Sequence, residues 1–349
     1  MHLRFLIAVL LFVGCDKNSN NNNERTSRPP VTGNTTFTNP LLPSGPDPWA
    51  VQKDTTYYYT HTFGDRIVVF KTNKMSELNK ATTTTIWSPP SNTAYSREIW
   101  APELHFINGK WYAYFAADDG QNKNHRMYVL ENASADPLSG TWEFKGKVAD
   151  PSDKWAIDGS VFEYNGQLYF IWSGWEGDIN VRQNIYIAKM DNPWTITGNR
   201  VMLSTPTYDW EKNGDPDVNE GPEALKNRSG KLFLTYSASG CWTDNYALGL
   251  LSLKAGGDPM NPADWTKSPT PVFTTKASNG AYGPGHNGSF KSRDGSEDWI
   301  IYHANSQPGQ GCGDFRNPRM QKFTWNADGT PNFGEPVKIN TKIQKPSGE

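Results

Sequence analysis

The sequence predicts an all-β fold, and more narrowly a five-bladed β-propeller. Aromatic residues make up 13% of the 349 residues, alongside 31 glycines and 25 prolines, a composition that favours strands joined by turns. One segment pattern recurs five times at intervals of roughly 55 to 65 residues, a period typical of propeller blades. No stretch predicts a long helix, and the alternative of two β-sandwiches would not explain a fivefold repeat.

The five repeats share one local pattern. Each opens with small residues or proline and one polar residue, continues as a short apolar strand, turns sharply and returns as an aromatic-rich strand. The predicted turns are Lys53-Asp54, Asn108-Gly109, Asn165-Gly166, Ser229-Gly230 and Asp294-Gly295. Asn-Gly and Asp-Gly suit tight hairpins because they tolerate positive φ. Further strand pairs, such as "HRMYVLENA" with "TWEFKGKV", bring each repeat to about four strands.

One polar residue marks the opening of each repeat: Asp47, Glu103, Asp158, Glu220 and His286. The first strand of each propeller blade lines the central channel, so we expect these residues to converge at one end of it. Carboxyl groups in a channel with aromatic walls suit glycoside hydrolysis, in which one carboxyl must be protonated and another ionised. The sequence contains no nucleophile elbow, phosphate-binding loop or zinc-ligand spacing.

The N-terminal region predicts export. One arginine and a short apolar run precede Cys15, which resembles a lipoprotein-type signal peptide over residues 1–15, with a chance cysteine after an ordinary secretory signal as the alternative. Residues 16–36 predict a flexible Asn-rich tether, and residues 37–349 the propeller. We therefore expect a secreted protein, lipid-anchored in the bacterial periplasm or on the cell surface, that meets the membrane only through this anchor.

Charge and cysteine content narrow the possible partners and compartment. The net charge of −2 and the pI near 6.3 give no reason to expect nucleic-acid binding. Cys241 and Cys312 remain after Cys15, and an oxidising compartment would permit a disulfide between them. The sequence leaves open whether they pair.

Five motifs carry a resemblance to a known family. "GPDPWA", "WAPELHFINGKWYAYFAA", "AIDGSVF", "NEGPEAL" and "GPGHNGSF" resemble the blade motifs of glycoside hydrolase family 43 (clan F), over about Asn39 to Val337. This family contains α-L-arabinofuranosidases, endo-arabinanases and β-xylosidases on a five-bladed propeller. "HRMYVLE", "DPLSG", "VNEGPE" and "YGPGHN" are most similar to its exo-acting α-L-arabinofuranosidase branch. The resemblance implies inverting release of terminal α-L-arabinofuranosyl residues, with exo-1,5 specificity, from arabinan or arabino-oligosaccharides.

The resemblance also implies roles for individual residues. Asp47 matches the general base, Glu220 the general acid, and Asp158 the carboxylate that orients the acid and sets its pKa. His286 matches a histidine that binds a metal, usually calcium, mainly through waters, and no organic cofactor is implied. Arg316 or Arg319 matches a substrate-binding arginine, and the register favours Arg316.

Several alternatives stay open at the level of sequence. Trp100, Trp172 and Trp175 are candidates for a sugar-binding wall, and packing within the blades explains them equally well. Glu223 is a rival acid, and Glu103 fits a hydrogen-bonding scaffold better than an acid. We expect a monomer acting on plant cell-wall arabinan or arabinoxylan oligosaccharides.

Two other functions share these sequence features. One is a β-xylosidase or endo-arabinanase of the same family, and the other is a non-catalytic carbohydrate-binding surface lipoprotein. The insertions Asp119–His125 and Ser239–Tyr246 help to distinguish end-trimming from internal cleavage. If they close one end of the channel, trimming from chain ends is favoured.

Overall fold

Strands build almost all regular structure in residues 35–349, the part of the chain that the computed structural model describes. The predicted signal peptide and nearly all of the predicted tether lie outside this part. Within it the chain is all-β, as the sequence predicts. None of the helices in this part is long and apolar enough to span a membrane.

The strands follow one another as five antiparallel groups of four. The first group contains β2 (Trp49–Lys53), β3 (Thr56–Thr60), β4 (Ile67–Thr72) and β5 (Thr82–Trp87), and the second contains β6 (Arg97–Ile107), β7 (Lys110–Asp118), β8 (Arg126–Asn132) and β9 (Glu143–Val148). The third contains β10 (Ala156–Tyr164), β11 (Gln167–Gly174), β12 (Arg182–Asn192) and β13 (Thr195–Ser204). The fourth contains β14 (Asp217–Lys226), β15 (Leu232–Ala238), β16 (Ala247–Leu253) and β17 (Trp265–Lys267), and the fifth β18 (Tyr282–Lys291), β19 (Asp298–Asn305), β20 (Asn317–Trp325) and β21 (Pro331–Asn332).

The remaining elements are short. β1 (Thr36–Phe37) pairs with β22 (Ile343–Gln344) and so joins the two ends of the described chain. Five 3-10 helices lie in connections: η1 (Met75–Lys80), η2 (Asn122–Asn124), η3 (Asp209–Glu211), η4 (Pro262–Asp264) and η5 (Ala277–Asn279).

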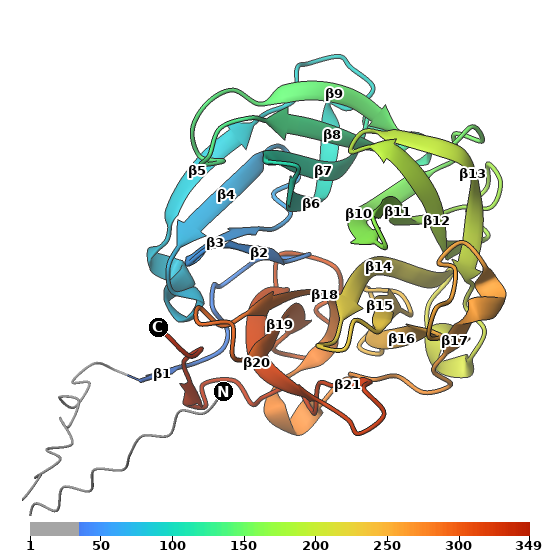
Figure 1. The fold of residues 1–349 in the computed structure, drawn as a ribbon. Helices are drawn as coiled ribbons and strands as arrows, with labels where there is room; N and C mark the ends of the chain where they lie inside the picture. The colour runs from blue at the N-terminus through green and yellow to red at the C-terminus, as the bar shows by residue number, and fades with distance from the viewer. Residues whose placement is uncertain (1–34) are drawn as a thin grey trace, which may run out of the picture. The chain divides into compact units, whose positions relative to one another are not determined.

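The five groups lie in chain order around a common centre (Figure 1), with β2, β6, β10, β14 and β18 nearest to it. Each of these first strands contacts the first strand of the next group, and β18 contacts β2. The openings of all five repeats therefore meet at the centre. Large apolar side chains fill the space between neighbouring groups, as where Tyr114, Phe170 and Trp172 pack together.

The positions of the hairpin turns agree with the prediction in part. Asn108-Gly109 and Asn165-Gly166 form two-residue turns in which both residues have positive φ. The first turn lies at Asp54-Thr55, one residue later than predicted. The last two repeats use longer loops around Gly230 and Gly295.

A bulge interrupts the first strand in four of the five repeats. It shows that the polar residues predicted to be equivalent do not all occupy the same position of their repeats. The pairing shifts between Trp100 and Glu103, Ile157 and Ser160, Glu220 and Glu223, and Gly285 and Gly288. One residue at each shift has a left-handed backbone conformation: Ala101 (φ 43°), Asp158 (φ 54°), Gly221 (φ 54°) and His286 (φ 44°). Asp47 (φ 55°), just before β2, has the same conformation. Glu103 therefore lies two residues after the equivalent position and Glu220 one residue before it. The predicted equivalence holds only for Asp47, Asp158 and His286.

Candidate active site

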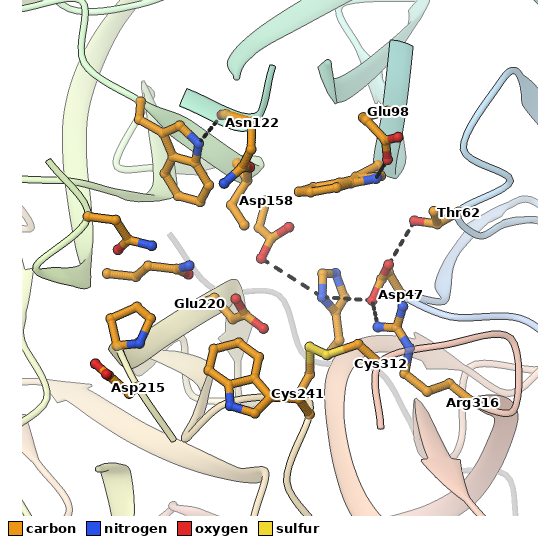
Figure 2. A pocket seen from close by; sticks show the side chains of 18 residues that line it. Asp47, Thr62, Glu98, Asn122, Asp158, Asp215, Glu220, Cys241, Cys312 and Arg316 are labelled. Atoms are coloured by element: carbon orange, nitrogen blue, oxygen red, sulfur yellow. Dashed lines mark hydrogen bonds and ion pairs between the residues drawn. A yellow bond between two sulfur atoms is a disulfide. The ribbon is translucent and has the colours of Figure 1, made fainter. Parts of the chain in front are cut away.

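The bulges open into a pocket of about 640 Å³ at one end of the first strands. Six of the candidate catalytic, substrate-binding and metal-binding residues line it: Asp47, Trp100, Asp158, Glu220, His286 and Arg316. Figure 2 shows Asp47, Asp158 and Glu220 facing the same space from different groups of strands. A left-handed residue at a bulge turns its side chain out of the alternating pattern of a strand, which directs Asp158 and His286 into the pocket.

Asp47 is held as a carboxylate. Its Oδ1 accepts a hydrogen bond from Arg316 Nη1 at 2.8 Å, and its Oδ2 accepts one from Thr62 Oγ1 at 2.7 Å. Its backbone N–H donates to His303 Nδ1 at 3.0 Å. Burial alone would raise the pKa of Asp47, but Arg316, His286, His303 and the Thr62 hydroxyl together hold this pKa well below its usual value. Asp47 can therefore accept a proton.

The surroundings of Glu220 shift its pKa in the opposite direction from that of Asp47. Burial raises the pKa of Glu220 to about 7, and the nearby charge of Asp47 acts in the same direction. The Tyr246 hydroxyl donates a hydrogen bond to Glu220 Oε1 at 2.7 Å and limits this rise in pKa. Glu220 can therefore carry a proton near neutral pH while Asp47 is ionised.

Asp158 contacts the backbone beside Glu220 rather than its side chain. Its Oδ2 accepts a hydrogen bond from the Gly221 N–H at 3.0 Å and lies 4.0 Å from His286 Nδ1. Burial, together with repulsion from Glu220 and Asp47, holds the pKa of Asp158 well above its usual value. This contact fixes the strand at the residue that follows Glu220.

The structure separates the two candidate arginines. Arg316 lines the pocket and pairs with Asp47. Arg319 is fully buried, and its guanidinium donates to the carbonyls of Gly280 and Asn305 and to Asn317 Oδ1. Arg319 thus connects neighbouring segments of the chain through hydrogen bonds and does not line the pocket.

The three candidate tryptophans also differ. Trp100 lines the pocket, donates from Nε1 to Glu98 Oε2 and stacks on His125. Trp172 and Trp175 are 3% and 4% exposed, lie in the core and do not line the pocket. Trp175 stacks behind Trp155, which is the residue that reaches the pocket.

The rival carboxyls lie elsewhere. Glu223 is buried, accepts hydrogen bonds from the N–H and hydroxyl of Ser289 at 3.1 and 2.9 Å, and does not line the pocket. Glu103 contacts His105 Nε2 at 2.9 Å, consistent with a scaffold. Burial raises the pKa of both carboxyls well above the usual value.

Sequence reasoning missed several pocket residues. Thr62 joins Asp47 to the second group by accepting a hydrogen bond from the Ala101 N–H at 2.7 Å. Trp242 lines the pocket, and Tyr246 contacts the pocket residue Glu220 without lining the pocket itself. Both come from the insertion Ser239–Tyr246, whose length was the available signal. Cys241 and Cys312, whose pairing the sequence left open, form a disulfide that lines the pocket.

His286 is the residue that the family resemblance relates to a metal. Burial lowers the pKa of His286, which leaves a neutral ring that can coordinate a metal. Among residues 35–349, no group of three or more His, Cys, Asp or Glu side chains is placed to hold a metal. Water would therefore have to supply most ligands of a calcium ion there.

Comparison with known proteins gives consistent matches. Residues 37–331 match the family model described as glycosyl hydrolases family 43. An extracellular exo-α-(1→5)-L-arabinofuranosidase of Streptomyces avermitilis is 44% identical over 317 residues, which cover 88% of this chain and 65% of that protein. The enzyme of the same name from Streptomyces chartreusis is 42% identical over 77% of this chain and 82% of its own length. This chain thus spans somewhat less than two thirds of the Streptomyces avermitilis protein.

A solved structure shows the same fold. The crystal structure of an α-L-arabinofuranosidase from Lactobacillus brevis superposes with a TM-score of 0.82 and 40% sequence identity, covering 87% of this chain and 98% of that one. A thermostable family-43 glycoside hydrolase gives a TM-score of 0.77 at 25% identity, over 90% of this chain and all of that one.

Proposed function

Because the chain belongs to glycosyl hydrolases family 43, we propose that it is an inverting α-L-arabinofuranosidase. Its substrates are the terminal α-L-arabinofuranosyl residues of arabinan or arabino-oligosaccharides, with exo-1,5 specificity. The observation that carries the proposal is the pairing, in one pocket, of an ionised Asp47 with a Glu220 whose pKa is about 7. The names of the similar enzymes support the choice of sugar.

The chemistry follows from these protonation states. Asp47 accepts a proton from a water molecule as the water oxygen attacks the anomeric carbon. The glycosidic C–O bond breaks, and Glu220 gives its proton to the leaving oxygen. Water enters on the face opposite the leaving group, so the released arabinose has inverted configuration. Asp158 is a positioning residue, since it holds the Gly221 N–H beside Glu220.

We also propose the finer features of the molecule. The five groups of strands are the blades of a closed propeller, which the ring of contacts between first strands supports. The protein is secreted, held at the membrane through a lipidated Cys15, and monomeric. Calcium at His286, mainly water-coordinated, would supply positive charge beneath the pocket.

The test is a substrate panel with two carboxyl variants. Asp47→Asn and Glu220→Gln should each lower kcat on linear 1,5-arabino-oligosaccharides by about 10²–10⁴-fold. Glu131→Gln is a matched control, because Glu131 is a buried carboxyl paired with Lys110 outside the pocket. Product analysis by NMR should show L-arabinose, first as the inverted anomer, together with oligosaccharides shortened by one residue at a time. Unchanged turnover in either folded pocket variant would contradict the proposal. So would release of xylose from xylo-oligosaccharides in place of arabinose release, or early release of di- and trisaccharides by cleavage inside the arabinan chain.

A further inference from the structure

Trp242 presents an aromatic surface to the pocket that the reaction described above does not use. Three tryptophans line the pocket: Trp100, Trp155 and Trp242. Trp155 is 3% exposed, whereas Trp242 is 44% exposed. Within residues 35–349, Trp100 and Trp155 donate their ring N–H groups to Glu98 and Asn122, but no such hydrogen bond is made by Trp242. Trp242 therefore keeps exposed surface at the pocket, and its Nε1–H has no hydrogen-bond partner in this part of the chain.

The indole is nevertheless held in place. A Cβ added at Gly240 would lie 2.3 Å from Trp242 Cε2, and one added at Gly214 would lie 3.0 Å from its Nε1. The ring therefore packs directly on the backbone of two glycines. The residue before it, Cys241, is fixed to Cys312 by the disulfide. A rigid aromatic surface of this kind loses little conformational entropy when a ligand binds.

The position of Trp242 identifies which part of the substrate it meets. The loop that carries Trp242 also carries Tyr246, which hydrogen-bonds Glu220. Figure 2 shows Glu220, Asp215 and Cys241 on one side of the pocket and Asp47 and Thr62 on the other. The acid stands beside the leaving oxygen, and the base stands across the sugar ring from it. The Glu220 side is therefore the side on which the leaving group lies.

We propose that Trp242 is a specificity-determining residue that stacks on the sugar ring of the leaving group, the pentofuranose next along the chain. The inference rests on the proposed function and deepens it. The indole covers the C–H face of that sugar, and its Nε1–H donates to a sugar hydroxyl or ring oxygen. Aromatic residues bury a large apolar area while keeping one polar contact, which suits an amphipathic sugar. Trp242 thereby favours substrates in which a sugar, rather than a small alcohol, departs.

The test compares a disaccharide with a glycoside whose leaving group is too small to reach the indole. The substrates are linear α-1,5-arabinobiose and methyl α-L-arabinofuranoside, and the measurement is kcat/KM for arabinose release from each. Trp242→Ala should lower the ratio of kcat/KM for arabinobiose to kcat/KM for methyl α-L-arabinofuranoside by at least about tenfold. Trp242→Phe should keep most of the ratio because it keeps an aromatic face. Phe106→Ala is the matched control, since Phe106 is 39% exposed and lies outside the pocket.

The outcomes separate this inference from the proposed function. An unchanged ratio in folded Trp242→Ala, with an active wild-type protein, would overturn the inference and leave the proposed function intact. A wild-type protein that releases arabinose from neither substrate would overturn both. If circular dichroism shows that Trp242→Ala does not fold, Trp242→Leu and Trp242→Phe replace it. Equal ratios in those two variants would overturn the inference, and a lower ratio in Trp242→Leu alone would support it.

Discussion

Removing the Tyr246 hydroxyl tests whether Glu220 is the acid. This hydroxyl donates to Glu220 Oε1 at 2.7 Å and so favours the ionised carboxylate. A hydrogen bond to a charged group contributes about 1.5–3 kcal/mol and a neutral one about 0.5–1.5 kcal/mol. The difference of about 1–1.5 kcal/mol corresponds to about one pKa unit. In Tyr246→Phe, the pKa of Glu220 should therefore rise from about 7 by about one unit.

The measurement is the pH dependence of kcat/KM on arabinobiose. Activity requires protonated Glu220, so it is lost as pH rises through the pKa of Glu220. The alkaline limb should move upward by about one pH unit in Tyr246→Phe, and the acid limb should stay in place. Phenylalanine keeps the ring stacked on His303 at 5.7 Å between centroids. An alkaline limb that stays in place or moves downward would refute the assignment of Glu220 as the acid.

A matched control shows whether the shift is specific. Tyr112 donates its hydroxyl to Glu131 Oε2 at 2.8 Å, and neither residue lines the pocket. Tyr112→Phe removes the same kind of hydrogen bond from a carboxyl outside the site. Its pH profile should coincide with that of the wild-type protein.

Two further changes act on other parts of the pocket. Arg316→Ala removes the cation 2.8 Å from Asp47 Oδ1, so the pKa of Asp47 should rise and the acid limb of kcat/KM should move to higher pH. An acid limb at its wild-type position would contradict the role of Arg316. Replacing Cys241 and Cys312 with serine opens a cross-link between residues 71 apart in sequence and should lower the free energy of unfolding in urea by about 2–4 kcal/mol. Equal stability with and without the disulfide would contradict this expectation.

Much of the fold could be predicted because its signals are local and repeated. Asn108-Gly109 and Asn165-Gly166 mark turns by themselves, since both residues of each pair adopt positive φ. The repeat also predicts that residues far apart in sequence meet, because the first strands share a centre. The bulges could not be predicted, since a left-handed Ala101 (φ 43°) carries no sign of that conformation in its residue type.

The surroundings of the carboxyls were harder to predict than the carboxyls themselves. The hydrogen bond from Arg316 to Asp47 spans 269 residues, and only the arrangement of the strand groups around a common centre (Figure 1) brings the two together. Trp172 and Trp242 have the same residue type, yet one is 3% exposed in the core and the other is 44% exposed in the pocket. Composition cannot make that distinction, because blade packing and sugar binding both use aromatic side chains.

The break in the repeat at Glu220 gives this carboxyl different neighbours from those of Asp47. Asp47, Asp158 and His286 occupy the left-handed position of their repeats, but in the fourth repeat Gly221 occupies it. A Cβ at Gly221 would lie 3.2 Å from His286 Nδ1, so glycine leaves room for that ring, and its N–H is free to bond Asp158. Glu220, one residue earlier, instead meets the Tyr246 hydroxyl, while Arg316 pairs with Asp47. A strictly symmetric repeat would give each carboxyl the same surroundings and the same pKa. Acid–base catalysis requires the two to differ, and the Arg316 cation beside Asp47 and the burial of Glu220 supply that difference.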